Sequence, residues 1–330
     1  MKFRIIGMVL IVLLGFSCKK KADVSGAVKS SAQSDKPVAL CTVAMVGDLV
    51  RHIAGDHIQV QTMLGPGIDP HAHKPTRKDI YSLQSADIIF YSGLNLEGKM
   101  IDTIKNLEAK KPVLAVSEQL PADKFLFPEG SEGHADPHVW MDVALWAEII
   151  DPVADFLSAQ YPENRSDFLV NAKELKSKLI KMDAKIMEIL KTVPEESRVL
   201  ITAHDAFQYF SHAYRIRVEG VQGISTESEA GIRQINKLVD LLVEQKVKAV
   251  FVESSVSDKN VKALIEGAAS RGHKVKLGGE LFSDAMGNPG TYEGTYQGML
   301  DHNATIITIA LGGNADPKGL YGKLSPKDEK

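Results

Sequence analysis

Apolar and polar residues alternate along the chain in two different ways. Short runs rich in β-branched and aliphatic residues predict strands, and the segments between them carry apolar residues every three or four positions, which predicts amphipathic helices. This alternation is typical of βαβ units with parallel sheets. The predicted strands form two sets of four: 40–44, 58–63, 87–91 and 113–116, then 198–202, 216–221, 248–253 and 274–277.

A long helix is predicted between the two sets of strands. Residues 164–192 lie between Pro162 and Pro194, and at 1.5 Å per residue they extend about 44 Å, enough to cross two lobes. One face carries an apolar stripe with spacings of four and three, formed by Phe168, Ala172, Leu175, Leu179, Met182, Ile186, Ile189 and Val193. We expect an α/β fold with two lobes, each a mainly parallel four-stranded sheet with flanking helices, joined by one long rigid helix. A surface helix of a single domain is the alternative.

The N-terminus has the pattern of a secretion signal. Lys2 and Arg4 precede an apolar run, residues 5–16, which is shorter than the ~20 residues of a membrane-spanning helix. Cys18 follows a small residue, and this resembles the bacterial lipobox, in which the cysteine is diacylated and becomes the new first residue. A leucine expected three positions before the cysteine is replaced by glycine. We expect a lipid anchor at Cys18; an ordinary signal cleaved elsewhere is the alternative.

These patterns divide the chain into five parts. Residues after Cys18 are rich in Ser, Ala and Lys and have few large apolar side chains, so they predict a flexible tether that forms no core. The expected parts are a signal peptide 1–17, a lipidated tether 18–36, an N-terminal α/β lobe 37–162, a linking helix 163–193 and a C-terminal α/β lobe 194–330.

Charge and cysteine content exclude some classes of function. The chain has 39 basic and 42 acidic residues, and leaving out residues 1–36, with seven basic and two acidic ones, gives 32 against 40. An acidic body argues against nucleic acid as a partner, because phosphates require a basic surface. It suits a cation ligand, although solubility explains it equally well. Cys41 is the only cysteine after Cys18, so no internal disulfide is expected in the mature protein.

Three histidines and one aspartate follow predicted strands or lie in the loops after them. They are His71, His138, His204 and Asp284. Ligands of open α/β sheets gather beyond the carboxyl ends of the strands. Three imidazoles and one carboxylate complete the coordination of a divalent transition metal, here with two ligands from each lobe. Each signal alone is weak, because a single histidine in a loop more often lies on the polar surface and binds nothing.

The tripeptide DPH occurs twice, at residues 69–71 and 136–138. Proline fixes the backbone before each histidine, and Asp69 and Asp136 are placed to accept the free ring N–H of the histidine that follows. The alternative is that both aspartates are turn residues.

Several longer motifs resemble one protein family. They are GPGIDPHAHKPT, ADPHVWMD, ITAHDAFQYF, GISTESEAGIR, VFVESSV and GGELFSDAMG, and the similarity extends from about residue 40 to 313. The chain resembles the TroA-like metal-binding solute-binding proteins of bacterial zinc and manganese ABC importers. The resemblance implies that His71, His138, His204 and Asp284 are the metal ligands. It also implies capture of a metal ion outside the inner membrane and its delivery to a permease with its ATPase.

The remaining histidines have weaker claims to a role. His73 is interpreted as a rim residue or a transient ligand during metal uptake, with a solvated side chain as the favoured alternative. His134 is the only histidine of the loop 121–136, where zinc-specialised relatives often carry a His-rich insert that this chain lacks. The others, His52, His57, His212, His273 and His302, are not required for the site.

Two other classes of function are considered. A zinc hydrolase would use Glu280 or Asp205 as a base, but catalytic zinc keeps an open position that a fourth protein ligand fills, so we expect no enzyme. An adhesion lipoprotein is the other class, and no repeat or exposed apolar motif argues for it. We expect a monomer that binds one divalent ion, Zn²⁺ or Mn²⁺, with Fe²⁺ as a further option. His204, which is often glutamate in manganese-specialised relatives, favours zinc; the missing His-rich insert favours manganese.

Overall fold

The computed structural model describes residues 36–128, 131 and 133–325. These described residues belong to one compact unit. The predicted signal peptide, Cys18 and the tether up to residue 35 lie outside the described residues. Within the described part of the chain, no helix combines the length and the apolar character needed to cross a bilayer.

The first lobe contains the expected four-stranded parallel sheet. The strands are β1 (Val38–Cys41), β2 (Gln59–Thr62), β3 (Ile88–Tyr91) and β4 (Val113–Ala115), in the order β2-β1-β3-β4. The two central strands are almost entirely buried, which their continuous apolar sequences predict. The helices of this lobe are α1 (Ala44–Ala54), α2 (Arg77–Ser85), α3 (Ile101–Glu108), α4 (Val143–Glu148) and α5 (Ile150–Gln160).

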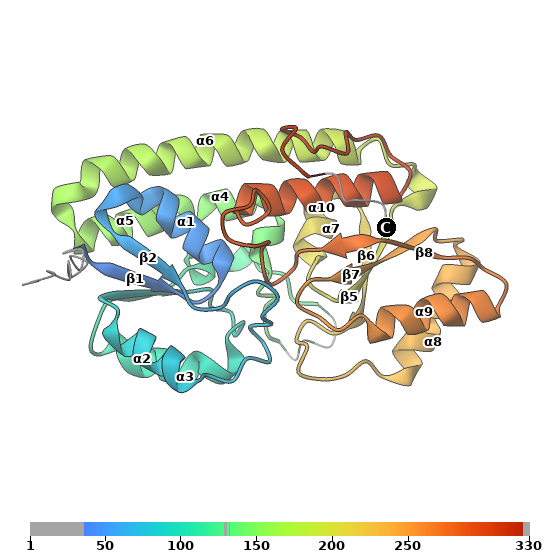
Figure 1. Ribbon diagram of the computed structural model, residues 1–330, viewed down its shortest axis with the longest axis horizontal. Helices are drawn as coiled ribbons and strands as arrows, with labels where there is room; N and C mark the ends of the chain where they lie inside the picture. The colour runs from blue at the N-terminus through green and yellow to red at the C-terminus, as the bar shows by residue number, and fades with distance from the viewer. Residues whose placement is uncertain (1–35, 129–130, 132, 326–330) are drawn as a thin grey trace, which may run out of the picture. The chain divides into compact units, whose positions relative to one another are not determined.

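The second lobe differs from the prediction of one four-stranded sheet. Its strands are β5 (Val199–His204), β6 (Arg217–Gln222), β7 (Ala249–Glu253) and β8 (Lys276–Leu281), and they form two parallel pairs, β5-β6 and β7-β8. Strands β5 and β7 lie side by side (Figure 1). At the carboxyl ends of β5 and β7, a side chain accepts the hydrogen bond that a backbone carbonyl would accept within a sheet. The backbone N–H of His204 donates to the carboxylate of Glu253. The helices are α7 (Gln208–Tyr214), α8 (Ile232–Glu244), α9 (Lys259–Ser270) and α10 (Tyr296–Ala310).

Strand β8 continues past residue 277, where the sequence predicted its end. Two glycines at this point of the strand serve close packing. A Cβ atom on Gly278 would lie 2.6 Å from the ring of Phe251 on β7, and one on Gly279 would lie 2.7 Å from Ile306 on α10. Gly279 also has φ = 148°, which disfavours other residues. The strand therefore carries the chain further toward Asp284 than the sequence indicated.

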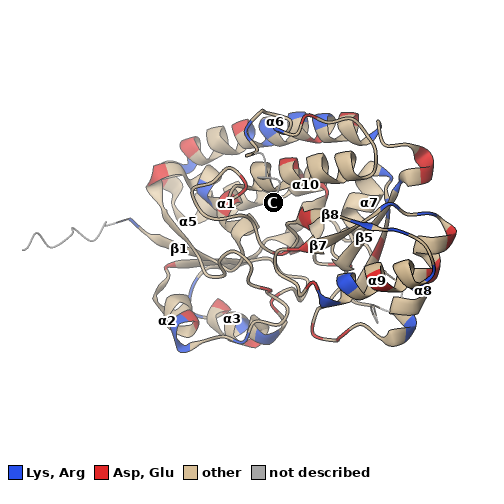
Figure 2. Ribbon diagram, turned by 45° about the vertical axis from the view of Figure 1, so that its right-hand side comes forward, with Lys and Arg blue, Asp and Glu red and all other residues tan. Residues whose placement is uncertain are grey.

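The long helix α6 (Arg165–Leu190) joins the two lobes. Its 26 residues extend about 39 Å, and it packs on α1, α4 and α5 of the first lobe and on α10 of the second (Figure 1). The predicted stripe is buried from Phe168 to Ile186; at its end Leu190 is buried in place of Ile189, and Val193 is buried beyond the helix. Its other faces carry Lys and Arg alternating with Asp and Glu (Figure 2).

One hydrophobic core extends through both lobes. Its buried members include Phe90 of the first sheet, Leu179 of α6, Phe210 of α7 and Leu300 of α10. A smaller cluster lies among α8, α9 and the strands of the second lobe. The lobes are therefore packed against a common interior, and this fixes the loops at the carboxyl ends of the strands relative to one another.

Candidate metal centre

The structure brings all four predicted ligands together. His71 lies in the loop between β2 and α2, His138 lies in the long connection between β4 and α4, His204 is the last residue of β5, and Asp284 follows β8. Each side chain offers one ligand atom, and these atoms all lie within 4.8 Å of one another. All four residues are buried, so they form a site that is largely closed to solvent.

The spacing of the ligand atoms fits a single metal ion. Nε2 of His71 lies 3.2 Å from Nε2 of His138, which is 3.2 Å from Oδ1 of Asp284. Nε2 of His204 lies 3.2 Å from Oδ2 of Asp284. Ligand atoms about 2.1 Å from a tetrahedral ion are about 3.4 Å apart, so little movement is needed to coordinate one.

Several of these buried atoms have no hydrogen-bond partner. Among the described residues, Nε2 of His204 and both carboxylate oxygens of Asp284 are buried without one. A buried carboxylate has lost the water that would solvate it, and a cation or a hydrogen-bond donor must compensate for that loss. A bound cation would satisfy these atoms, and the residues present therefore fit a metal ion.

Two carboxylates orient the histidine rings. Oδ1 of Asp136 accepts hydrogen bonds from Nδ1 of His138 at 2.7 Å and from its backbone N–H at 2.9 Å. Glu253 accepts from Nδ1 of His204 at 2.5 Å and from its backbone N–H at 2.8 Å. Because the carboxylates keep a proton on Nδ1, a ring that gives up its second proton presents the lone pair of Nε2 to a metal.

The sequence predicted one of these carboxylates and missed the other. Asp136 supports the ring of His138 as expected from the repeated tripeptide. Asp69 does not support the ring of His71; its Oδ1 accepts from the backbone N–H of His71 at 2.9 Å, so the alternative of a turn residue is correct here. Glu253 was not singled out, because only the contact between β5 and β7 places it beside His204. Its position at the end of a buried strand, in VFVESSV, was the available signal.

Opposite charges stabilise each other in the metal-free site. Burial alone would raise the pKa of Asp284, but the imidazoles of His204 and His138 outweigh it and hold this pKa well below its usual range. Burial would lower the pKa of His138, but Asp136 and Asp284 raise it to about 9; Glu253 and Asp284 likewise raise that of His204 well above its ordinary value. Burial lowers the pKa of His71 to about 4. At neutral pH two protonated rings therefore surround an ionised carboxylate.

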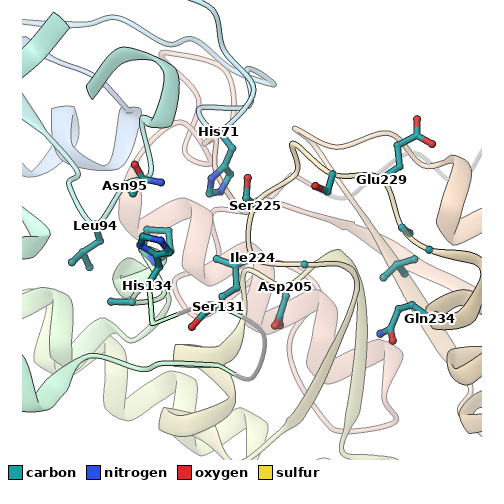
Figure 3. A pocket seen from close by; sticks show the side chains of 17 residues that line it. His71, Leu94, Asn95, Ser131, His134, Asp205, Ile224, Ser225, Glu229 and Gln234 are labelled. Carbon is teal, nitrogen blue, oxygen red and sulfur yellow. The ribbon is translucent and has the colours of Figure 1, made fainter. Parts of the chain in front are cut away.

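A cavity of about 540 Å³ opens beside the site. Of the four candidate ligands His71 lines it, together with Asn95, His134, Asp205 and Ser225 (Figure 3). The cavity therefore adjoins the site on the side of His71.

The other residues singled out in the sequence lie around the site. Nε2 of His73 is 3.0 Å from Oδ2 of Asp79 in the first turn of α2. Asp205 accepts a hydrogen bond from Gln208 at 2.6 Å, and burial raises its pKa to about 6. Glu280 lines a second cavity, of about 470 Å³.

Comparison with known proteins identifies the family of the chain. Residues 40–310 match the family described as zinc-uptake complex component A, periplasmic. The chain belongs to this family. The zinc-uptake component A family covers most of the folded unit, including all four candidate ligands.

Individual relatives match nearly their full length. The manganese-binding lipoprotein MntA of Bacillus subtilis is 44% identical over 305 residues, which cover 92% of this chain and 99% of MntA. The structure of the periplasmic zinc-binding protein TroA of Treponema pallidum has a TM-score of 0.81 and 43% identity, covering 84% of this chain and 99% of TroA. The Fe(III)-bound structure of YtgA of Chlamydia trachomatis has a TM-score of 0.75 and 28% identity, covering 84% and 99%.

The likeness to TroA confirms the α/β fold with two lobes and a long connecting helix. Relatives of this chain carry the names of metal-binding substrate-binding proteins of ABC importers, several of them lipoproteins. These names refer to manganese in some relatives and zinc in others, so membership of the family does not choose between the two metals.

Proposed function

We propose that the protein captures Zn²⁺ or Mn²⁺ on the outer side of the cytoplasmic membrane and delivers it to the permease of an ABC importer that is driven by its ATPase. His71, His138, His204 and Asp284 are the proposed ligands. The observation that carries the proposal is the cluster of buried ligand atoms within 4.8 Å, several of which lack a hydrogen-bond partner in the described part of the chain.

The metal is cargo in this proposal. Four protein ligands leave no open position on a tetrahedral ion, so a water molecule is not activated there. The carboxylates nearest the rings, Asp136 and Glu253, already accept ring N–H groups and do not act as general bases. The site therefore lacks the open coordination position that a zinc hydrolase needs.

The proposal includes a lipid anchor and the division of the chain. Diacylated Cys18 would hold the protein at the membrane, with residues 18–36 as the tether. Residues 37–162 and 194–330 would form the lobes around the linking helix 163–193. A monomer is sufficient, because one chain supplies all four ligands. Cys18→Ser should move the protein from the membrane fraction to the soluble fraction or block its processing; a native protein that is wholly soluble would contradict the anchor.

The test of the site is metal content and affinity. Purified protein should bind about one equivalent of metal, and His204→Ala should lower the affinity at least tenfold, because it removes a direct ligand. His73→Ala is the matched control, since His73 is bound to Asp79. Loss of binding in the control alone would show that the wrong histidine of the His71–His73 pair has been chosen.

The identity of the metal requires a biological test. Zn²⁺ binds most nitrogen and oxygen sites more tightly than Mn²⁺ does, so affinity alone does not identify the cargo. A deletion strain should fail to grow when the physiological metal is limiting, and the missing growth should return when the gene is restored. Growth that is unaffected by depletion of either metal would contradict the transport function.

A further inference from the structure

Two polar contacts join the first lobe to one loop of the second lobe, and one of them comes from the loop of His71. The hydroxyl of Thr226 donates a hydrogen bond to Asp69, and Lys99 forms an ion pair with Glu227 at 2.8 Å. Asp69 and Lys99 belong to the first lobe, whereas Thr226 and Glu227 lie in the loop between β6 and α8. We call these two contacts the latch.

Asp69 connects the latch to the backbone of His71. Its Oδ1 accepts hydrogen bonds from the backbone N–H groups of His71 and Ala72, at 2.9 and 3.4 Å, while its Oδ2 accepts from Thr226. Hydrogen bonds to an ionised carboxylate are stronger than those between neutral groups. One side chain therefore fixes the backbone of the loop on one side and holds the opposite lobe on the other.

His71 depends on its backbone more than the other two histidines do. The rings of His138 and His204 each donate Nδ1–H to a buried carboxylate. No hydrogen bond to Nδ1 of His71 is found among the residues that the structure describes. The position of its ring is therefore set by the loop, and the loop is held by Asp69.

The surroundings of the site also differ between its two sides. Close to Asp284 the lobes are joined by a buried hydrogen bond from the indole N–H of Trp140 to the carbonyl of Ser283, at 3.0 Å. The latch lies nearer to solvent, since the side chains of Lys99 and Glu227 are 35% and 46% exposed. Opening the latch therefore disrupts fewer buried contacts than separating the lobes does.

We propose that Asp69 and Thr226 are positioning residues that hold His71 in the metal site, and that His71 is the ligand that leaves first when the metal is released. The inference rests on the proposed function. Once the latch opens, the loop is free to carry the ring of His71 into the adjacent cavity, which offers about 540 Å³. His138 and His204 keep the carboxylates that support their rings, so the site opens on one side while the lobes stay packed.

The rate of metal release tests this proposal. Zn²⁺-loaded protein is mixed with excess chelator in a stopped-flow instrument. Thr226→Val should release the metal at least about tenfold faster, which is the effect of losing a hydrogen bond to a charged group. Thr226→Ser keeps the hydroxyl and should release at the wild-type rate. Ser228→Ala, at an exposed position of the same loop, is the matched control.

The ion pair of the latch permits a test by charge exchange. Lys99→Glu should speed release only about two- to threefold, because the pair is exposed. Combining it with Glu227→Lys should restore the wild-type rate. Lys105→Glu, on the exposed side of α3, is the control for the change in net charge.

A double-mutant comparison shows whether the latch acts through His71. In a His71→Ala background, Thr226→Val should cause no further acceleration, because the residue it positions is gone. As a readout without metal, hydrogen exchange at residues 69–73 should become faster in Thr226→Val while residues 199–204 stay unchanged. Three results would overturn the proposal. Thr226→Val could accelerate release equally with and without His71, it could release the metal within twofold of the wild-type rate, or it could leave exchange at residues 69–73 unchanged. Failure of the wild-type protein to bind one equivalent would instead overturn the proposed function.

Discussion

Glu253→Gln should weaken metal binding without removing a ligand. The side chain of Glu253 is fully buried and accepts two hydrogen bonds from His204, from the ring Nδ1 at 2.5 Å and from the backbone N–H at 2.8 Å. Glutamine has one acceptor oxygen and a donor in place of the other. One N–H of His204 therefore loses its acceptor, and the ring loses the anion that keeps the proton on Nδ1.

The magnitude follows from the role of such partners. Replacing a residue that supports a ligating histidine typically lowers metal affinity 10- to 100-fold, or about 1.4–2.8 kcal/mol at 25 °C. A second effect opposes this loss. Glu253 helps to raise the pKa of His204 in the metal-free protein, so glutamine also weakens the competition of protons for Nε2. We therefore expect a loss of about tenfold at neutral pH and a larger loss at higher pH, where protons compete less.

Competitive titration against a chromogenic chelator measures this effect. The Kd of wild type and Glu253→Gln is determined between pH 6.5 and 9.5, and the variant should show the shallower dependence on pH. Glu219→Gln on strand β6 is the control, because Glu219 forms an ion pair with Arg217 instead of contacting a candidate ligand. A Kd within threefold of wild type at every pH would refute the reasoning, provided that the metal-free variant melts at the wild-type temperature.

Three further predictions follow from the same structure. At pH 7.5, metal binding should release about two protons, because the pKa of His138 is raised to about 9 and that of His204 is also raised. Calorimetry in buffers of different ionisation enthalpy counts the released protons, and a binding enthalpy that does not depend on the buffer would contradict this prediction. A metal concentration of 100 times Kd should stabilise the fold by about 2.7 kcal/mol. The radius of gyration from X-ray scattering should stay unchanged, since α6 has no internal Gly or Pro, and a large compaction would refute a rigid helix. Gly279→Ala should cost about 1–3 kcal/mol in denaturant unfolding, because φ is 148°, whereas Gly65→Ala, which meets no atom within 4 Å, should be neutral.

Periodicity predicted the features of the fold that depend on local sequence. The strands, the burial of α6 from Phe168 to Ile186 and the parallel sheet of the first lobe all follow from the spacing of apolar residues. The two strand pairs of the second lobe were not predictable, because hydrogen bonding between strands depends on long-range contacts. The end of β8 was missed because glycine suits both a turn and a crowded strand, and Gly278 and Gly279 belong to the second case.

The candidate site shows the same division. The four candidate ligands were indicated by their positions after predicted strands and by the family resemblance. The structure brings these residues together: His71, His138, His204 and Asp284. The partners that orient the rings were predictable only where they are close in sequence, as with Asp136 and His138. Glu253 lies 49 residues from His204, and Thr226 lies 157 residues from Asp69, so no local pattern connects them.

The core shared by both lobes affects how the protein is assembled and how it can be altered. Since Phe90, Leu179, Phe210 and Leu300 belong to one buried cluster, neither lobe has a complete interior by itself. Either half expressed alone would present its unpaired apolar surface to solvent and aggregate, and the intact chain should melt in a single transition. A chimera that exchanges one lobe with a relative must therefore carry matching side chains along α6, whereas the loops that bear the metal ligands can be exchanged without changing this packing.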